Sequence, residues 1–253
     1  MGMEVVKAIT QADGMELVAA VDVLRVGEDA GVAAGIDSLG VVIAADLGQT
    51  LRSCASDVAV DFTVPDVAFG NIRTCLENGV ASVVGTTGLS QEQLDEIERL
   101  TRSMDTPAFI APNFAIGAVL MMRFAQQAAK YFEYADIIEL HHEKKLDAPS
   151  GTAVKTAQMI AAAKGAAMIS PNSANTKITL EGARGGVHEG IHIHSVRMPG
   201  FVASQEVTFG GLGQTLKVRH DSISRESFMP GVVMAVRRVR QLSGLTLGLE
   251  RIL

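Results

Sequence analysis

The sequence predicts an α/β protein with two domains, one a parallel sheet covered by helices and the other of mixed α+β structure. Two observations carry this prediction. Up to Phe114, short apolar runs alternate with segments of helical periodicity, which is typical of a parallel sheet with helices on both faces. After residue 176, segments with period-two alternation follow one another without helices between them, which is typical of mostly antiparallel strands.

The first half supplies the elements of the expected parallel sheet. Pro65 and Gly79 are typical boundary signals, and Ser90 and Gln93 have the spacing of a helix capping box. Helices are expected at 3–10, 66–79 and 89–103, and strands at 15–22, 58–65, 80–88 and 107–114.

The second half has a different rhythm. A helix is expected at 117–131, and it leads through a strand at 136–142 into a helix at 152–164. The last helical segment, 226–244, is long enough to return to the first domain. Between these helices, strands are expected at 177–182, 190–198, 203–211 and 214–222.

The composition is that of an ordinary globular protein and argues against several functions. Hydrophobic residues make up 47 % and charged residues 20 % of the chain, and the formal net charge is −6. Because tryptophan is absent and no block of basic residues occurs, nucleic acid is not an expected partner. A membrane is not expected either, because the most apolar stretch, 115–122, is too short to span a bilayer. The two cysteines lack metal or redox spacing, and no targeting segment occurs. We therefore expect a location in the cytoplasm or in the stroma-like compartment of a photosynthetic organelle.

Three features of the first half point to a ligand at the carboxyl ends of its strands, where open α/β sheets bind their ligands. They are Asp22, the pair Phe62-Thr63 and the Gly-Thr-Thr-Gly turn at 85–88. Asp22 lies 20 residues after Gly2, the spacing expected between a glycine fingerprint and the acid that binds an adenosine ribose. These features favour a Rossmann-like dinucleotide site, although each of them alone is also common in ordinary turns.

The beginning of the chain departs from the usual dinucleotide pattern. Such a fold is expected to open with a hydrophobic strand and a glycine loop, followed by a helix whose N-terminus holds the pyrophosphate. This sequence begins with "MGMEVVKAITQ", which already has the pattern of that helix. We therefore expect the first strand and the glycine loop to be missing from this sequence, which puts cofactor affinity in question.

The densest group of titratable residues is "ELHHEKKLDAPSGTA", residues 139–153. His141 and His142 stand at the exit of a strand, and Ser150, with the two residues after it, opens a helix. The free N–H groups of a helix start form an anion site, so a carboxylate-bearing substrate is expected there. Lys145 or a histidine would be placed to deliver a proton to that substrate.

Structural interpretations of the same residues stay open at this point. Ser150 could serve only as a helix cap, and Asp147 could pair with Lys145. A zinc site that combines these histidines with those at 188, 192 and 194 is disfavoured, because adjacent histidines point to opposite faces of a strand and no H-E-x-x-H pattern occurs. No metal is therefore expected.

The segment 139–153 resembles the signature E-x-H-H-x-x-K-x-D-A-P-S-G-T-A of the 4-hydroxy-tetrahydrodipicolinate reductase (dihydrodipicolinate reductase) family of lysine biosynthesis. The resemblance covers nearly the whole chain. Further matching segments are "VDFTVPD" (60–66), "VVGTTGLS" (83–90), "APNFAIG" (111–117), "GARGG" (182–186), "HEGIHIHSVRMPG" (188–200) and "MPGVVMAVRRV" (229–239).

The resemblance implies a dinucleotide-binding domain at 1–113 and 223–253, and a substrate-binding and oligomerisation domain at 114–222 that forms a homotetramer. The implied reaction is the NAD(P)H-dependent reduction of 4-hydroxy-tetrahydrodipicolinate, a small dicarboxylate, to tetrahydrodipicolinate in the diaminopimelate route. The alternative is a catalytically impaired, N-terminally truncated relative that acts as a dicarboxylate-binding or oligomeric scaffold. The complete signature favours the enzyme, and the expected loss of the glycine loop favours the alternative.

The resemblance also implies residue roles. His141 corresponds to the catalytic proton donor or acceptor of the family and Lys145 to its proton donor. Asp22 favours NADH, because a carboxylate repels the 2′-phosphate of NADPH, while Arg25 opposes that preference. The implied substrate-binding residues are His142, Ser150, Gly151 and Thr152, and the implied cofactor-binding residues are Asp22, Phe62, Gly85, Thr86, Thr87, Ala111, Pro112, Asn113 and Phe114.

Overall fold

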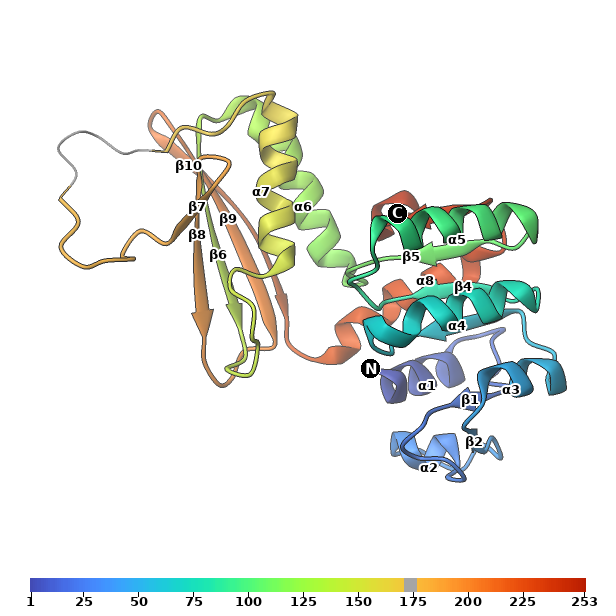
Figure 1. Ribbon diagram of the computed structural model, residues 1–253. Helices are drawn as coiled ribbons and strands as arrows, with labels where there is room; N and C mark the ends of the chain where they lie inside the picture. The colour runs from blue at the N-terminus through green and yellow to red at the C-terminus, as the bar shows by residue number, and fades with distance from the viewer. Residues whose placement is uncertain (171–176) are drawn as a thin grey trace. The chain divides into compact units, whose positions relative to one another are not determined.

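The computed structural model describes residues 1–170 and 177–253. The chain forms two compact units. Unit 1 consists of Met1–Ile116 together with Arg225–Leu253, and unit 2 consists of Gly117–Ser224. Figure 1 shows the course of the chain through both units.

Unit 1 contains the parallel sheet that the sequence predicts. Its four strands pair in the order β11-β5-β4-β3, all of them parallel. The strands are β3 (Val58–Asp61), β4 (Ala81–Val84), β5 (Ala108–Ile110) and β11 (Leu245–Leu247). The C-terminal segment therefore does return to the first unit, where Leu245 pairs with Ala108.

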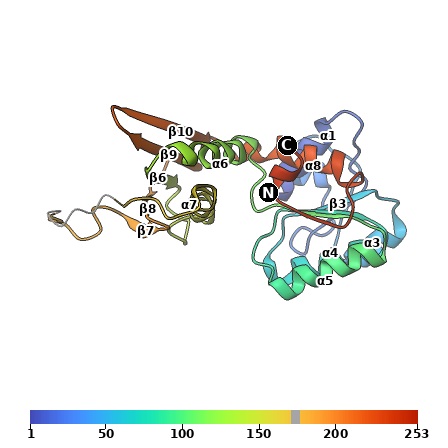
Figure 2. The ribbon, with the colours of Figure 1, turned by 90° about the horizontal axis from the view of Figure 1, so that it is seen from above.

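Helices cover both faces of this sheet, as Figure 2 shows for α4 and α5 on one side and α8 on the other. The capping box predicted for Ser90 and Gln93 is present at the start of α5. Six buried residues form the core beneath α4 and α5: Ile72, Leu76, Val84, Ile97, Ala108 and Ile110. The helices are α3 (Leu47–Ser53), α4 (Pro65–Glu77), α5 (Gln91–Ser103) and α8 (Met229–Val239), the last preceded by the 3₁₀ helix η2 (Arg225–Phe228). A further 3₁₀ helix, η3, spans Leu249–Arg251.

The N-terminal part of unit 1 forms a separate small sheet. Helix α1 (Gly2–Gln11) confirms the predicted first helix. Strand β1 (Ala20–Val21) pairs in parallel with β2 (Ile43–Ala44), and α2 (Ala30–Ala34) lies between them in the chain. The predicted strand at 15–22 is too long, because Met15 donates its N–H to Ala12 in a turn and only the last residues find a partner strand.

Unit 2 is built on a mixed five-stranded sheet in the order β10-β9-β6-β8-β7. Strands β6 and β8 pair in parallel and all other neighbours are antiparallel. The strands are β6 (Tyr134–His141), β7 (Gly186–His188), β8 (Ile191–Arg197), β9 (Ala203–Gly211) and β10 (Gln214–Ser222).

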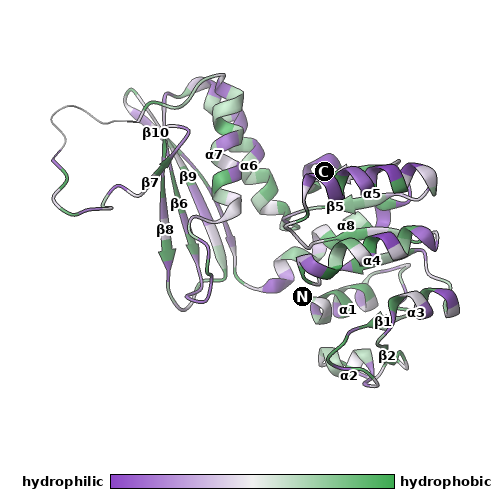
Figure 3. Cartoon of the chain, viewed as in Figure 1, coloured by the Kyte–Doolittle hydropathy of each residue, from purple (hydrophilic) through white to green (hydrophobic). Residues whose placement is uncertain are grey.

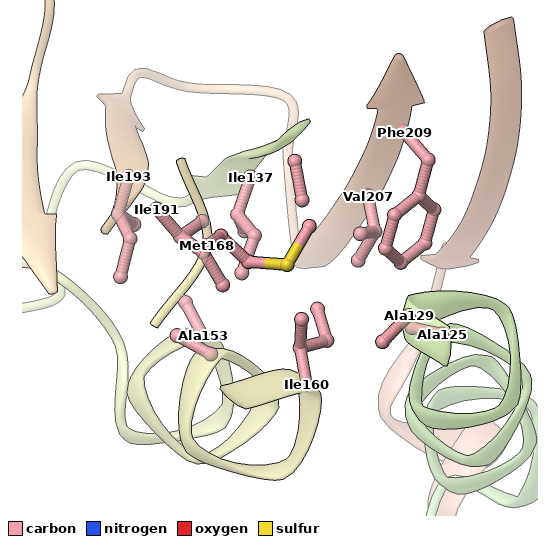
Figure 4. Packing of buried hydrophobic residues seen from close by; sticks show 12 residues of the cluster. Ala125, Ala129, Ile137, Ala153, Ile160, Met168, Ile191, Ile193, Val207 and Phe209 are labelled. Atoms are coloured by element: carbon pink, nitrogen blue, oxygen red, sulfur yellow. The ribbon is translucent and has the colours of Figure 1, made fainter. Parts of the chain in front are cut away.

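Two helices, α6 (Ile116–Ala128) and α7 (Gly151–Lys164), cover one face of this sheet, and the 3₁₀ helix η1 (Ala129–Tyr131) follows α6. Coloured by hydropathy, the strands β6 and β8 carry both apolar and polar residues along their length (Figure 3). Figure 4 shows how the side chains of the core meet between the sheet and the two helices, with Ile137, Val207 and Phe209 from the strands opposite Ile160 of α7.

The strand expected at 177–182 is wrong. In this segment Ala183 donates its N–H to Leu180 and Gly185 donates to Gly182, so the backbone is used in turns. Gly182 has a positive φ of 76°, which a strand residue does not adopt. The strand of this region is instead the short β7, which follows the turn and pairs with β8.

Within the described residues, the structure has no helix that combines the length and the apolar character needed to cross a membrane.

Candidate active site

The signature segment lies where β6 ends and α7 begins. Glu139 and His141 are two residues apart on β6, so their side chains share the face that α7 covers. The Glu139 side chain is 0 % exposed and that of His141 is 14 % exposed. A fully buried carboxylate is costly unless hydrogen bonds and a positive partner satisfy it.

Glu139 has such partners on both of its oxygens. Arg197 of β8 binds it with two contacts, 2.6 Å from Nη2 to Oε1 and 2.9 Å from Nη1 to Oε2. The backbone N–H of Ser150 donates to Oε1 at 3.2 Å, and Nδ1 of His141 lies within hydrogen-bond distance of Oε2. One buried carboxylate therefore connects the histidine ring, the partner strand and the start of α7.

The charge of Glu139 determines the orientation of His141. Burial raises the pKa of this carboxyl, but hydrogen bonds from His141, Arg197 and Ser195 outweigh burial and lower the pKa to about 2. The ionised carboxylate can only accept hydrogen bonds, so Nδ1 of His141 carries the proton in their contact. The opposite ring nitrogen, Nε2, is then the atom left to act on a ligand.

The start of α7 has the features of an anion site. Ser150 is the N-cap, and its Oγ accepts the N–H of Ala153 at 3.2 Å. A side chain placed on Gly151 would meet no atom within 4 Å, so space is open beside the first turn. Thr152 is half-buried next to that space. Helix N-termini with accessible N–H groups attract carboxylates and phosphates.

The loop between β6 and α7 carries Lys145. The backbone N–H of Lys145 donates to His142 O in a turn at 3.1 Å. Its Nζ donates to Oδ1 of Asp147 at 2.8 Å, and this hydrogen bond lowers the pKa of the Asp147 carboxyl. The pairing with Asp147 is the structural interpretation that the sequence left open, and the structure contains it.

The predicted cofactor residues gather at the carboxyl ends of β3, β4 and β5. The rings of Phe62 and Phe114 lie 5.6 Å apart, and Phe62 packs directly on Gly85. Thr86 is buried and donates to Oδ1 of Asp61 at 3.1 Å. The structure therefore brings these four predicted residues together at one edge of the sheet.

Asp61, which the sequence did not single out, ties this edge together. Its carboxylate accepts the N–H and the hydroxyl of Thr63 at 2.8 and 2.7 Å, as well as Nδ2 of Asn71 at 2.8 Å. With the bond from Thr86, Asp61 fixes the turns after β3 and β4 to each other. Turns held in this way are suited to present backbone groups to a ligand.

The other predicted cofactor residues flank this edge. Ala111 is buried and donates its N–H to Val84 O, whereas Pro112 and Thr87 are exposed. Asn113 accepts the N–H of Ala115 through Oδ1 at 2.9 Å, which shapes the turn into α6.

Asp22 lies apart from that group, directly after β1 of the small sheet. Its side chain is exposed, and Oδ1 accepts the N–H of Leu24 at 2.7 Å. The neighbouring Arg25 is engaged elsewhere: one amino group contacts Glu28 at 2.8 Å and the other donates to Ala33 O at 2.7 Å. Arg25 is therefore committed to contacts within the protein.

The histidines of β8 have structural partners. His192 is buried, with Nδ1 2.6 Å from Arg184 O and Nε2 3.0 Å from the hydroxyl of Ser170. His194 lies 3.6 Å from Asp136. Across residues 1–170 and 177–253, no group of three or more His, Cys, Asp or Glu side chains is arranged to hold a metal ion.

Arg197 is the site residue that sequence reasoning missed. The sequence could have indicated that Glu139 needs a cationic partner. The alternation of β6 places Glu139 on a buried face, and a buried carboxylate requires a cation. Which cation it meets depends on the pairing of β6 with β8, which puts His141 beside Arg197. That register joins residues far apart in the sequence.

Comparison with known proteins gives consistent matches over both units. Residues 1–114 match the family described as "Dihydrodipicolinate reductase, N-terminus", and residues 117–253 match "Dihydrodipicolinate reductase, C-terminus". A 4-hydroxy-tetrahydrodipicolinate reductase of Moorella thermoacetica is 48% identical over 253 residues, which are 100% of this chain and 94% of the relative. A protein of the same name from Listeria innocua is 50% identical over 100% of this chain and 95% of its own length.

Solved structures agree with these matches. A dipicolinate-bound dihydrodipicolinate reductase from Paenisporosarcina sp. TG-14 has a TM-score of 0.88 and 44% identity, covering 100% of this chain and 96% of that chain. An amine dehydrogenase from Mycobacterium smegmatis has a TM-score of 0.67 at 16% identity, covering 100% and 93% of the two chains. The second similarity concerns the fold alone.

Proposed function

The chain belongs to the dihydrodipicolinate reductase family, and from this premise we propose that it reduces 4-hydroxy-tetrahydrodipicolinate to tetrahydrodipicolinate with a nicotinamide dinucleotide. The family predicted from residues 139–153 is thereby confirmed. The relatives that match over the full chain are named as reductases, which favours the enzyme over the scaffold alternative.

One observation of the structure carries the proposal. A single buried carboxylate, Glu139, binds both the ring of His141 and the backbone N–H of Ser150. The carboxylate of Glu139 thus holds both a side chain that can transfer a proton and a helix start that can bind an anion. That combination suits a substrate with carboxylates and a reacting centre that needs a proton.

The chemistry assigns separate tasks to these residues. Exchange of the 4-hydroxyl for hydrogen takes up one hydride and one proton and releases one water. The bound nicotinamide cofactor supplies the hydride. We assign the donation of this proton to Nζ of Lys145, and proton exchange with the substrate to Nε2 of His141, which is free to accept a proton. We assign the binding of substrate carboxylates to His142, Ser150, Gly151 and Thr152.

The edge of the unit 1 sheet fits such a cofactor. Gly85 leaves space that the ring of Phe62 fills, and Asp61 holds the turns of Thr63 and Thr86 in place. We propose that this edge, with Thr87 and residues 111–114, holds the nicotinamide half, and that Asp22 binds the adenosine ribose. Hydroxyl and backbone N–H groups at strand ends supply the hydrogen bonds that such a ligand needs.

The function is tested with the purified chain. It should oxidise NADH or NADPH only when 4-hydroxy-tetrahydrodipicolinate is supplied, and dipicolinate, the planar analogue, should inhibit this reaction. Cofactor absorbance in a coupled assay measures the rate. Binding of dipicolinate without any turnover would support the scaffold alternative instead.

The Thr152→Val variant keeps the shape of the helix start but removes its hydroxyl. We expect dipicolinate to bind roughly tenfold more weakly, since one hydrogen bond to a charged group is lost. Calorimetry measures the affinity, and Thr74→Val in α4 is the control for a threonine lost from another helix. Unchanged dipicolinate affinity in Thr152→Val would mean that this hydroxyl serves only the helix.

We also propose a preference for NADH over NADPH. The exposed carboxylate of Asp22 would repel a 2′-phosphate, and the guanidinium of Arg25 is already bound to Glu28 and to the carbonyl of Ala33. No free cation of this loop therefore compensates the repulsion.

Replacing Asp22 by serine should shift the ratio of the two cofactor affinities. We expect the ratio of the NADPH Kd to the NADH Kd to fall by roughly tenfold, because the like-charge repulsion disappears. Fluorescence titration with each cofactor measures the ratio. Asp13→Ser, at another exposed acid of unit 1, should leave it unchanged. An equal ratio in Asp22→Ser and wild type would show that Asp22 does not contact the ribose.

A homotetramer is the proposed assembly. Helices α6 and α7 cover only one face of the unit 2 sheet (Figure 1). Tyr134 and Ile138 lie on the other face and are 40% and 38% exposed, although both are large and apolar. Large hydrophobic side chains left exposed on an uncovered sheet face are typical of an interface between subunits. Light scattering should give a mass of about four times the 26.7 kDa chain, and a monomer mass would contradict the assembly.

A further inference from the structure

Arg197 has no assigned role, yet both amino groups of its guanidinium are engaged at the centre of the site. Nη1 donates to Oε2 of Glu139 at 2.9 Å and to Val196 O at 2.8 Å. Nη2 donates to Oε1 of Glu139 at 2.6 Å and to Asp147 O at 2.8 Å. Both amino groups are therefore occupied within the protein, and the remaining nitrogen, Nε, is buried without a hydrogen-bond partner.

The contact between Arg197 and Glu139 fixes the plane of the carboxylate. A guanidinium that binds both oxygens of a carboxylate leaves it a single orientation, which one ammonium group cannot impose. In that orientation Oε2 faces Nδ1 of His141 and Oε1 faces the N–H of Ser150. The ring of His141 is thus aimed through two successive contacts that begin at Arg197.

Stability alone does not explain the ion pair between Arg197 and Glu139. Glu139 is 0 % exposed and the Arg197 side chain 18 % exposed, so both charges are largely removed from water. A buried ion pair of this kind often contributes nothing beyond what well-packed apolar residues would contribute. Its value here lies in the direction that it gives to the histidine, whose ring is otherwise free to turn about its side-chain bonds.

We propose that Arg197 is a positioning residue for the reaction, which orients the His141 ring through Glu139. The inference rests on the proposed role of His141 in proton transfer. Arg197 touches no reacting atom itself, and its effect is on the rate with which bound substrate reacts.

The test is a double-mutant cycle in kcat with the full chain. Arg197→Lys keeps the charge but removes the two-pronged contact, and it should lower kcat by roughly tenfold to hundredfold, the effect of a displaced catalytic group. The Kd for NADH should not change. In a His141→Ala background the same substitution should change kcat by less than about threefold, because the ring that it orients is gone.

A matched control comes from the same sheet. Arg219 of β10 also binds a carboxylate with two contacts, Nε to Oδ2 and Nη2 to Oδ1 of Asp221, both 2.8 Å. Arg219→Lys should keep wild-type kcat. Because this residue lies on the open face of the sheet, light scattering should also confirm an unchanged mass.

Three results would overturn the inference. The first is wild-type kcat in a folded Arg197→Lys variant, and the second is an equal loss of kcat with and without His141. The third is wild-type kcat in His141→Ala alone, which removes the proposed role of the histidine and the inference with it. This single variant separates failure of the proposed role from failure of the positioning step.

A second variant covers the case in which Arg197→Lys does not fold. Replacing Glu139 by glutamine and Arg197 by methionine together removes both buried charges and leaves neither unpaired. This pair should fold and still lose kcat, again only when His141 is present. Full kcat in the folded pair would overturn the inference.

Discussion

The Lys145→Ala variant is expected to lose turnover by roughly 10²–10⁴-fold, the usual contribution of a positioned proton donor. Lys145 lies in the loop between the His141 strand and the anion-binding start of α7, and its Nζ is 2.8 Å from Oδ1 of Asp147. An ammonium group held there can give its proton to a substrate bound at the helix start. Because the cofactor is proposed to bind unit 1, the Kd for NADH should stay unchanged.

Lys144 provides the matched control for this prediction. It is the adjacent lysine, fully comparable in chemistry, and it is exposed. Lys144→Ala should retain kcat within about threefold, as expected for a surface substitution away from the site. Steady-state kinetics of both variants, with circular dichroism as a check on folding, decides the question. Near-normal turnover in folded Lys145→Ala would remove Lys145 from the mechanism.

The Gly85→Ala variant is expected to weaken NADH binding by roughly tenfold to hundredfold. A Cβ on Gly85 would lie 2.1 Å from Cε1 of Phe62, which is closer than any tolerated contact, so the ring must move. Phe62 in turn contacts Phe114, and both are predicted cofactor residues. Overpacking of this kind costs about 1–3 kcal/mol, which corresponds to that range in affinity when it falls on the binding surface.

A second glycine separates this local effect from a general effect of alanine. Gly70 lies in α4, and a Cβ there would meet no atom within 4 Å. Gly70→Ala should therefore keep the NADH affinity and gain slightly in thermal stability, because alanine favours the helix. Titration of the two variants with NADH is the measurement. Wild-type affinity in folded Gly85→Ala would place the cofactor away from Phe62.

Local patterns predicted much of this molecule. The helix at the start of the chain, the capping box of α5 and the strand-to-helix junction around residues 139–153 depend on neighbours in the sequence, and the structure contains all three. The parallel strand β4 is a buried apolar run, which single-sequence patterns also indicate.

What the sequence did not predict depends on pairing over long distances. Strands β2 and β11 have two and three residues, which is too few for an alternation of apolar and polar residues to be recognised. They are strands because their backbones pair with a neighbouring strand. The segment at 177–182 alternates like a strand but closes into turns. Arg197 could not be assigned to Glu139 from the sequence, because the parallel register of β6 and β8 brings them together.

The roles of the individual site residues remain predictions that the variants above are designed to test. The structure places Phe62, Gly85, Thr86 and Phe114 together, and it joins His141 to the start of α7 through Glu139. Asp22 follows β1 of the small sheet, which is separate from the sheet whose strand ends carry Phe62, Gly85 and Thr86. A cofactor with two halves, one adenosine and one nicotinamide, is the kind of ligand that such a separated set of residues would contact.

The return of the C-terminal segment to unit 1 has a consequence for how the protein is made. Strand β11 pairs with β5, so Leu245 pairs with Ala108 although all of unit 2 lies between them in the sequence. On the ribosome, the sheet that is proposed to hold the cofactor stays without its last edge strand until synthesis is nearly finished. Unit 2 is continuous in the sequence and is available to fold earlier. Premature termination a few residues before Leu245 would therefore leave unit 2 intact and the parallel sheet of unit 1 without β11.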